Sequence, residues 1–307
     1  MNLEYLKSFY ITVTNNSISK AAKQLHMTQP GLSMQLQALE KDLGVNLLIR
    51  SNKGVQITEA GKILFDYAST ILSLNDNITR DLDNLKTNKK QLIIGSCKAI
   101  GEYSLPCSIY LFKQDNKDLN LSLEVENTTE VINDLLNNSV DLGITQYKSN
   151  ETEIIFEKIV SDDIILITSM PLMKEKITLE ELKRLPLIMR EEGSGTRKII
   201  KDKLEKSGMN IDYLTVIFEL NSNEAIKTSV TSGKGAAFIP KFSVLRELRM
   251  KTVQEIEIEG IKLNADYHIA YRKNGELTPE ENDLLCRVSN NAPMGRLMRQ
   301  HWTPVCL

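Results

Sequence analysis

Amide and hydroxyl side chains on one face of a predicted helix near the N-terminus have the chemistry needed to read DNA. From Asn16 to Arg50 the sequence reads as two helices joined by a tight corner and followed by an exit strand. The second helix is predicted to bury Leu32, Leu36, Leu39 and Leu43. Its opposite face then consists of Gln29, Ser33, Met34 and Gln37. Glutamine can form a pair of hydrogen bonds with adenine in the major groove, and serine is short enough to reach a base or a phosphate. The alternative is a helical hairpin whose polar face only meets water.

A second set of hydroxyl and cationic side chains falls in four loops of the remaining chain. Three of these loops follow a predicted strand and the fourth precedes a predicted helix. In such sheets ligands sit beyond the carboxyl ends of the strands, where helix N-termini offer unpaired N–H groups. The loops are Ser96-Cys97-Lys98-Ala99, Asn127-Thr128, Thr145-Gln146 and Gly193-Ser194-Gly195-Thr196, the last followed by Arg197. Hydroxyl and N–H groups at a helix start are suited to a carboxylate, sulfate or phosphate. The last loop lacks the Lys-Ser/Thr ending of a P-loop, and simple helix capping by Ser194 and Thr196 is the alternative to an anion site.

The cysteines give no sign of a metal site, a disulfide framework or a cofactor. The four are Cys97, Cys107, Cys286 and Cys306, and none of them forms a CxxC pair. We therefore expect reduced thiols. Cys97 falls by position in the predicted anion site, where helix N–H groups and Lys98 would lower the pKa of its thiol. Redox sensing with Cys107 as the resolving partner is one hypothesis, and packing of Cys97 in the core is the other.

Composition sets the outer bounds on the class of protein. With 307 residues, 41% hydrophobic and 25% charged, the chain can form two domains with a sizeable core. The net charge of -2 argues against a protein that binds polyanions over its whole surface, so a DNA contact needs a local basic surface. The segment from Met1 to Val13 is interrupted by Glu4 and Lys7, so it is neither a signal peptide nor a membrane span. We expect a cytoplasmic protein.

The elements that position the polar helix face follow from apolar spacing and capping. A stripe from Leu3 to Val13 predicts a first helix that packs under the two-helix unit. Thr28 is a good N-cap for the polar-faced helix, and Pro30 sits near the first helical position, where its missing N–H costs nothing. After this helix, Leu47–Arg50 and Val55–Ile57 predict a hairpin around Ser51-Asn52-Lys53-Gly54. Arg50 and Lys53 would then contact phosphate or the minor groove.

A long helix with one apolar stripe is predicted from Thr58 onward. Leucine, isoleucine and tyrosine recur at spacings of three and four from Leu64 to Leu85. About 30 residues at ~1.5 Å each would span ~45 Å, more than a small domain needs for its own core. The identical helix of a second copy is the simplest partner, and packing against the chain's own second domain is the alternative.

Beyond a polar break at Asn88-Lys89-Lys90, strands and helices alternate as in βαβ units with a mainly parallel sheet. Two such sets follow one another, and Ile256–Arg272 is predicted as a strand pair that returns to the first set. The chain would pass twice between the two lobes formed by these sets, and this arrangement predicts a cleft between the lobes. The stretch Asn291–Leu307 reads as a poorly ordered tail, to which we assign no function.

The chain resembles LysR-type transcriptional regulators. The resemblance is carried by Ala21-Ala22, Gln29-Pro30, Ser33, Leu39-Glu40, Leu43-Gly44 and Thr58-Glu59-Ala60-Gly61, and it fails only near the C-terminus. It implies an α/β fold with a winged helix-turn-helix over 1–58, a dimerising linker helix over 59–88 and a periplasmic-binding-protein-like effector domain over 89–303. Lobe I would comprise about 91–162 and 267–300, and lobe II about 163–266.

The resemblance also implies which residues contact DNA and effector. The expected DNA-binding residues are Thr28, Gln29, Pro30, Ser33, Met34, Gln37, Arg50 and Lys53. The expected effector-binding residues are Ser96, Cys97, Lys98, Ala99, Thr128, Thr145, Ser194, Thr196 and Arg197. Met34 departs from the Arg or Lys that the family commonly has there, which leaves the target sequence open.

The function implied is that of a transcription factor that binds DNA as a dimer or tetramer and responds to a small molecule. Its partners would be double-stranded DNA with an interrupted palindrome, a small anion or carboxylate, a second copy of the chain and, as a further candidate, RNA polymerase. The stretches Met189–Arg197 and Asn221–Ile226 are most similar to regulators of sulfur metabolism or carbon fixation. An enzyme is disfavoured because the three histidines form no nucleophile–base pair or metal spacing. The alternatives are a solute-binding component and a redox-sensing regulator that uses Cys97.

Overall fold

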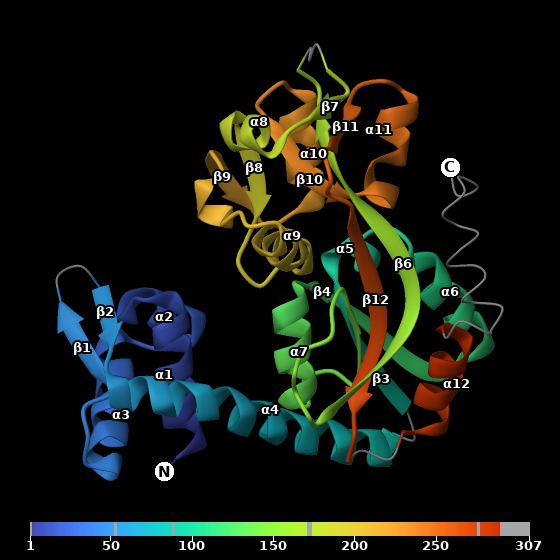
Figure 1. The fold of residues 1–307 in the computed structure, drawn as a ribbon. Coiled ribbons are helices and arrows are strands. Elements are labelled where there is room, and N and C mark those ends of the chain that lie inside the picture. Colours follow the sequence, from blue (N-terminus) through green and yellow to red (C-terminus); the bar gives the residue numbers. More distant parts are fainter. Residues whose placement is uncertain (1, 52–53, 88–89, 171–173, 275–276, 289–307) are drawn as a thin grey trace. The chain divides into compact units, whose positions relative to one another are not determined.

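The computed structural model describes residues 2–51, 54–87, 90–170, 174–274 and 277–288. The chain divides into two compact units, which are described separately (Figure 1). Unit 1 comprises Met1–Asn88 with Asn137–Ser139, and unit 2 comprises Lys89–Leu136 with Val140–Leu307. The predicted C-terminal tail from Asn291 lies outside the described residues.

Unit 1 begins with three short helices and a hairpin. The elements are α1 (Leu3–Asn15), α2 (Ile18–Gln24), α3 (Gln29–Leu43), β1 (Leu48–Ser51) and β2 (Gly54–Ile57). The predicted two-helix corner is confirmed: His26 turns it in the left-handed backbone region, with φ of 53°. Phe9, Ala21, Leu32 and Leu36 form the core of the three helices. Leu43 was expected there too, but it is 38% exposed because it occupies the last turn of α3, beyond the helices that cover the other leucines.

Helix α4 (Glu59–Thr87) is the predicted long helix, 29 residues in length. The hydroxyl of Thr58 caps it by accepting the N–H of Gly61 at 2.9 Å. Gly61 permits a close approach to the hairpin, since a Cβ at that position would lie 2.2 Å from the carbonyl oxygen of Leu47. Tyr10 of α1 stacks on Phe65 of α4, with ring centroids 4.8 Å apart. These contacts fix the first turns of α4 against the three-helix core.

Unit 2 alternates strands and helices, as predicted. Its first half contains β3 (Lys90–Cys97), α5 (Lys98–Gly101), α6 (Leu105–Asp115), β4 (Leu119–Glu126), α7 (Thr128–Leu136), β5 (Leu142–Thr145) and β6 (Ile154–Thr168). Its second half contains β7 (Lys176–Ile177), α8 (Leu179–Arg184), β8 (Leu187–Arg190), α9 (Gly195–Lys206), η1 (Ile211–Tyr213), β9 (Val216–Leu220), α10 (Asn223–Thr231), β10 (Ala236–Pro240), η2 (Lys241–Val244), α11 (Leu245–Arg249), β11 (Gln254–Ile258), β12 (Leu263–Arg272) and α12 (Pro279–Val288).

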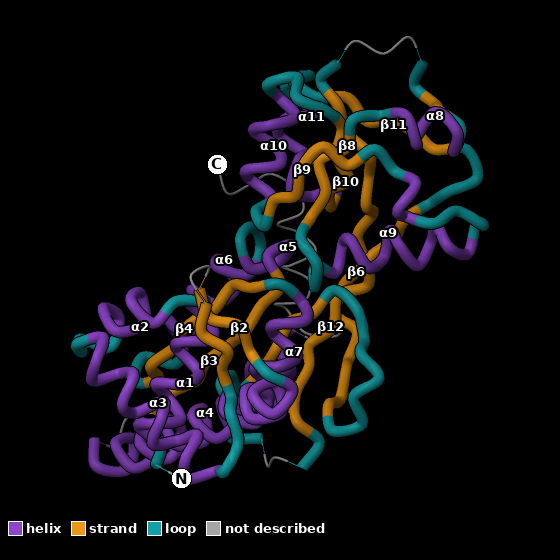
Figure 2. The backbone as a smooth tube through the Cα atoms, turned by 90° about the vertical axis from the view of Figure 1, so that its left-hand side faces the viewer, coloured by secondary structure: helices purple, strands orange, loops and turns teal. Residues whose placement is uncertain are grey.

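These strands form one sheet in the order β4-β3-β5-β12-β6-β10-β8-β9, with β11 on β6 and β7 on β11. Strands β3, β4 and β5 pair in parallel at one end, and β8, β9 and β10 do so at the other. The two long strands between them, β6 and β12, are antiparallel to each other and run side by side from one half to the other (Figures 1 and 2). The mainly parallel sheet is thus confirmed for each lobe. The first ten residues of β6 were not predicted as a strand.

Helices cover both faces of the sheet. Successive strand residues point to opposite sides, and apolar residues on both sides are buried against these helices. In β6, Leu166 joins the core that includes Ile200 and Leu204 of α9. Its neighbours Ile165 and Ile167 join a different core with Ile226 of α10. No helix within the described ranges is long and apolar enough to cross a membrane.

Candidate DNA-reading surface and effector site

Helix α3 presents the predicted polar face. Thr28 accepts the N–H of Gly31 at 3.2 Å and so starts the helix, with Pro30 in its first turn. Gln29, Pro30 and Gln37 are exposed, Met34 is 70% exposed and Ser33 is half-buried. Residues four apart on a helix share a face, so Gln29, Ser33 and Gln37 form one row along α3, beside the stripe of buried leucines.

Contacts on the inner side of α3 hold this row in place. The hydroxyl of Ser8, itself buried in α1, donates to the side-chain carbonyl of Gln35 at 2.5 Å. At the other end, the carboxylate of Glu40 accepts the N–H groups of Leu47 and Leu48 at 2.8 and 3.1 Å. Glu40 therefore ties α3 to the hairpin, a role that sequence reasoning did not assign. The side chain of Arg50 and all of Lys53, both predicted to contact DNA backbone, lie outside the described residues.

The predicted effector loops meet in unit 2. Lys98 donates to the carbonyl oxygen of Asn221 at 2.6 Å and lies 3.8 Å from the carboxylate of Glu191. Thr129 donates from its hydroxyl to the carbonyl oxygen of Gly193 at 3.2 Å. These bonds connect the ends of β3 and β4 with the loops after β8 and β9. Tertiary folding therefore assembles one site from segments about 100 residues apart in sequence.

The hydroxyl groups of this site are buried but differ in their partners. Thr128 accepts the N–H of Gln146 at 3.3 Å, and Thr196 bonds to the Gln146 side chain at 3.1 Å. Ser96 donates to the carbonyl of its neighbour, Cys97, at 3.2 Å. Ser194, at the start of α9, is 2% exposed, and its hydroxyl has no partner among the described residues.

Two of the other predicted residues do not offer a free polar group to this site. Thr145 turns its hydroxyl to the carbonyl oxygen of Tyr147 at 3.0 Å, and Ala99 is packed in the hydrophobic core. Gly195, by contrast, is required by the close packing here. A Cβ at Gly195 would lie 2.6 Å from the Cβ of Gln146 and 2.8 Å from the hydroxyl of Thr128.

The cation at the centre of the site is Arg190, which the sequence analysis did not single out. It ends β8, is 4% exposed and donates to the Asn223 side chain at 2.8 Å. Two further bonds of 2.7 and 2.9 Å run from its guanidinium to the carboxylate of Glu191. The only sequence signal for it was an arginine at a strand end just before a Gly/Ser loop.

Arg197, the cation that was predicted, is occupied by other groups. It donates to the carbonyl oxygen of Arg190 at 2.8 Å and forms ion pairs with Glu192 at 2.9 Å and Glu219 at 2.5 Å. Two carboxylates therefore offset its charge. Glu219 is 22 residues away in sequence, and its approach could not be read from the motif.

Burial dominates the electrostatics around Arg190. It raises the pKa of the Cys97 thiol to about 12, although the charge of Arg190 and nearby backbone N–H groups act in the opposite direction. Burial also raises the pKa of Glu102, against the charges of Arg190 and Lys98. A buried thiol that stays protonated is a poor nucleophile. The environment of Cys97 thus fits the core-packing alternative and opposes the redox hypothesis.

Three buried polar atoms near Arg190 and α9 lack a hydrogen-bond partner within the described part of the chain. They are the hydroxyl of Ser194, the amide nitrogen of Asn223 and the hydroxyl of Tyr267. Asn223 bonds directly to Arg190, and the charge of Arg190 acts on the Tyr267 hydroxyl. Buried polar groups without a partner are costly, so this arrangement is suited to a polar ligand. Within the described residues, no group of three His, Cys, Asp or Glu side chains could hold a metal ion.

Comparisons with known proteins agree in both units. The family model described as "Bacterial regulatory helix-turn-helix protein, lysR family" matches residues 3–62, and that described as "LysR substrate binding domain" matches residues 86–290. A "Probable RuBisCO transcriptional regulator" of Phaeodactylum tricornutum is 34% identical over 271 residues, which cover 85% of this chain and 87% of that protein.

Two solved structures share the fold. CbnR, a LysR family transcriptional regulator, has a TM-score of 0.63 at 19% identity, with 98% of this chain and 99% of that chain covered. The regulatory domain of Synechocystis PCC6803 CcmR, in complex with 2-PG, has a TM-score of 0.59 at 22% identity, with 69% and 97% covered.

Proposed function

Because the chain belongs to the family of LysR-type transcriptional regulators, we propose that α3 reads the major groove of DNA and that the site around Arg190 binds the effector. We assign residues 1–58 to the winged helix-turn-helix, 59–88 to the linker helix and 89–303 to the effector domain. We also propose a cytoplasmic location, because a DNA-binding regulator acts in the compartment that holds its DNA. We propose that the protein has no catalytic activity, in line with the lack of a nucleophile–base pair among its histidines.

The proposed DNA contacts rest on the exposed row of α3. Gln29 lies at the start of the helix, where side chains reach furthest into the groove in helix-turn-helix proteins. Its amide suits adenine, while Ser33 suits a base or a phosphate. Met34, 70% exposed on the same turn, offers an apolar contact to a thymine methyl group. Arg50 and Lys53 remain proposed backbone contacts on the grounds of sequence alone.

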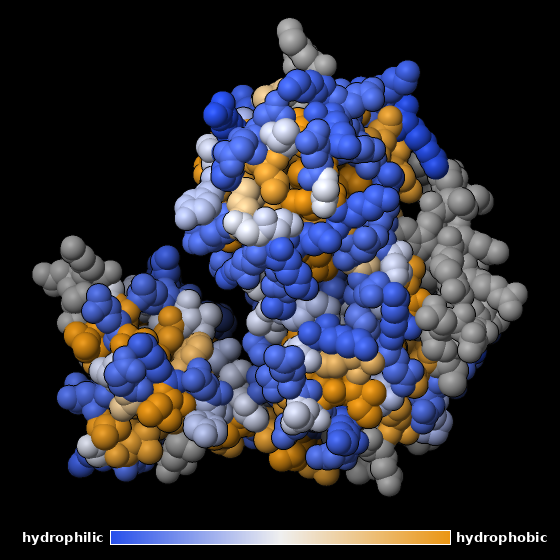
Figure 3. Space-filling model, in the orientation of Figure 1, coloured by the Kyte–Doolittle hydropathy of each residue, from blue (hydrophilic) through white to orange (hydrophobic). Residues whose placement is uncertain are grey.

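The proposed assembly rests on the apolar stripe of α4. Exposed large side chains on this helix are Ile63, Tyr67, Leu74, Ile78 and Leu82, with exposed fractions from 43 to 66%. Orange, apolar side chains are visible on the surface of unit 1 in Figure 3. Such a stripe on one helix needs a partner. We propose that α4 pairs with its copy in a second subunit, so that two reading helices meet an interrupted palindrome.

The proposed effector is a small anion that carries a carboxylate or phosphate. One observation carries this proposal: Ser194 is buried at the N-terminus of α9 with an unsatisfied hydroxyl, where helix N–H groups favour anions. Arg190 is the buried cation of the site, and it shares its charge with the carboxylate of Glu191. The solved CcmR domain holds 2-PG, and the relative from Phaeodactylum is described as a RuBisCO regulator. We therefore favour a link to carbon fixation and 2-PG as the first ligand to test, over a link to sulfur metabolism.

The test is selection of genomic DNA fragments by the full-length protein, followed by sequencing. We expect enriched fragments to share an interrupted palindrome, and their retention to change when 2-PG, sulfate or phosphate is added. An effector changes the affinity for DNA only if it binds one conformation of the protein more tightly than the other. Retention of random fragments with no shared sequence would contradict the DNA-reading role. A shared sequence with no response to any of the three anions would contradict the proposed effector class alone.

A further inference from the structure

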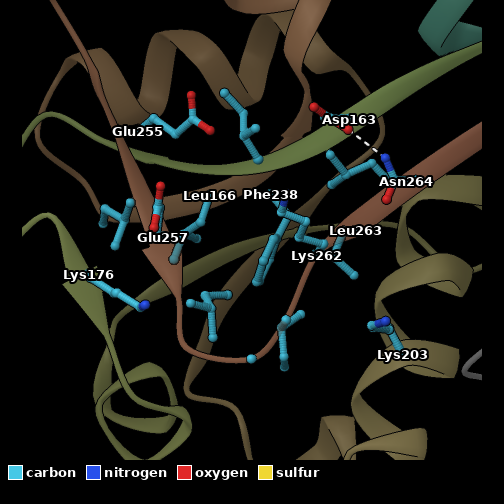
Figure 4. A pocket seen from close by; sticks show the side chains of 16 residues that line it. Asp163, Leu166, Lys176, Lys203, Phe238, Glu255, Glu257, Lys262, Leu263 and Asn264 are labelled. Atoms are coloured by element: carbon cyan, nitrogen blue, oxygen red, sulfur yellow. Dashed lines mark hydrogen bonds between the residues drawn. The ribbon is translucent and has the colours of Figure 1, made fainter.

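A cavity lies in unit 2 apart from the proposed effector site. Its volume is about 550 Å³, and it shares no lining residue with the site around Arg190. Residues of β6, β10, β11 and β12 form its walls, with α9 at one side (Figure 4). Volumes of 300–1,000 Å³ are typical of small-molecule sites.

The floor of the cavity is apolar and well ordered by packing. Leu166, Phe238 and Ile256 line it, and each is no more than 3% exposed. All three belong to the main hydrophobic core of unit 2. Only a small part of each of these side chains is open to the cavity, and Ile261, which is partly exposed, supplies further apolar lining.

Lysines of three different elements surround this floor. They are Lys176 of β7, Lys203 of α9 and Lys262 between β11 and β12. None of the three has an ion-pair partner within 4.0 Å among the residues the structure describes. In Figure 4, Lys176 and Lys203 lie on opposite sides of Leu166 and Phe238.

The carboxylates at the cavity offset this charge only in part. Glu255 is paired with Lys241 at 2.9 Å, and Asp163 accepts a hydrogen bond from Asn264 at 2.5 Å. Glu257 lies opposite Lys176 in the pairing of β11 with β7, so it offsets the charge of that lysine. The amide of Asn264 is neutral, so Asp163 keeps its charge. Lys203 and Lys262 therefore face one carboxylate, which leaves a single net positive charge at this side of the cavity.

We propose that this cavity is a second ligand site, which takes an amphipathic anion with an aliphatic or aromatic body and a carboxylate end. The body would lie against Ile261 and the small open parts of Leu166 and Phe238, and the carboxylate would reach Lys203 and Lys262. The cavity also borders both long strands, since Ile164 of β6 and Leu263 of β12 line it and pair with each other. A ligand there contacts the two strands that connect the lobes, so it would modulate the regulator if it prefers one lobe arrangement.

The probe is sodium octanoate, titrated calorimetrically into the full-length protein. We expect saturable binding that is about fourfold tighter for each methylene gained between hexanoate and octanoate, because the chain is buried on the apolar floor. 1-Octanol should bind more weakly, since it lacks the charge. Equal binding of octanol and octanoate, or no saturable binding of octanoate, would overturn the proposal.

Charge reversal with a matched control locates the site. Lys203→Glu should weaken octanoate about tenfold, because one attractive contact is replaced by a repulsive one. Lys201→Glu changes the net charge equally on the same helix, but Lys201 is exposed and does not line the cavity. Lys201→Glu should change the affinity for octanoate by no more than about twofold. Equal losses in both variants would show only a general effect of net charge and would refute the site. Loss of octanoate binding in Ser194→Ala would refute it too, because it would place the probe in the effector site.

Discussion

The substitution Ser194→Ala should make the unliganded protein more stable and at the same time less responsive to its effector. Ser194 is 2% exposed, its hydroxyl has no partner among the described residues, and it makes no capping bond to α9. A buried polar group without a partner costs ~1–3 kcal/mol. Its removal should therefore raise the free energy of unfolding by ~1 kcal/mol or more, where most buried substitutions lower it. For a unit of about 200 residues this corresponds to a rise in Tm of ~2–4 °C.

The same substitution should weaken binding of the effector, although it stabilises the unliganded protein. At ~100 times its dissociation constant, an effector stabilises the wild type by ~2.7 kcal/mol. A hydrogen bond to a charged ligand contributes ~1.5–3 kcal/mol, so its loss should weaken binding at least tenfold. At the same ligand concentration the stabilisation would fall to ~1.4 kcal/mol for a tenfold loss and to ~0.4 kcal/mol for a hundredfold loss.

The assay is thermal and urea unfolding of the full-length protein with and without 2-PG. Ser108→Ala is the matched control, because Ser108 in α6 is 1% exposed and its hydroxyl also lacks a partner in the described structure. Both variants should gain stability without ligand, but only Ser194→Ala should lose the response to 2-PG. A less stable unliganded Ser194→Ala would show that its hydroxyl is satisfied, and an undiminished 2-PG response would remove Ser194 from the site.

Three further predictions concern DNA, assembly and pH. Gln29→Ala should cost ~1–3 kcal/mol on the preferred DNA site and little on random DNA, as measured by fluorescence anisotropy; equal losses on both would refute base reading. Leu74 and Ile78 are 43% and 61% exposed on α4. Replacing both by Asp would place unpaired charge in the proposed α4–α4 interface and should dissociate the dimer, as measured by light scattering. A wild type that is monomeric at micromolar concentration would refute the pairing. Burial raises the pKa of Asp162 in β6 from 3.8 to about 7. Between these values the folded state binds more protons than the unfolded state, so stability should fall as pH rises, by up to ~1.4 kcal/mol per pH unit. Asp162→Asn should flatten this slope in urea titrations from pH 4 to 8, and an unchanged slope would assign it to other groups.

Much of unit 1 could be predicted because its signals are local. The cap at Thr28, the proline after it and the leucines of α3 lie within one helix, and apolar spacing reports directly on which face is buried. The prediction was wrong at Leu43, because spacing cannot tell where the neighbouring helices end. The row formed by Gln29, Ser33 and Gln37 was predicted from the same periodicity; in the structure Gln29 and Gln37 are exposed and Ser33 is half-buried.

The long strand β6 shows a first limit of the sequence. Its last five residues, Ile164–Thr168, were predicted as a strand, but the ten before them carry Glu157, Lys158 and Asp162. In the sequence alone, such charged residues are typical of a loop. In the folded chain they belong to a strand because β12, more than 90 residues later, supplies the backbone partners.

The sequence by itself indicated the family, the alternation of strands and helices in unit 2, and the four loops that we propose for the effector site. Only the tertiary structure decided which side chains in those loops remain available to a ligand. Arg197 carries a charge in the right loop, but Glu219 comes from another strand and offsets it. Arg190, three residues before the Gly/Ser turn, becomes the buried cation and is paired with the adjacent Glu191. Cys97 has the neighbours that would lower its pKa, yet burial outweighs them. Periodicity and capping are properties of a few consecutive residues, whereas ion pairing and desolvation depend on groups that only folding brings together.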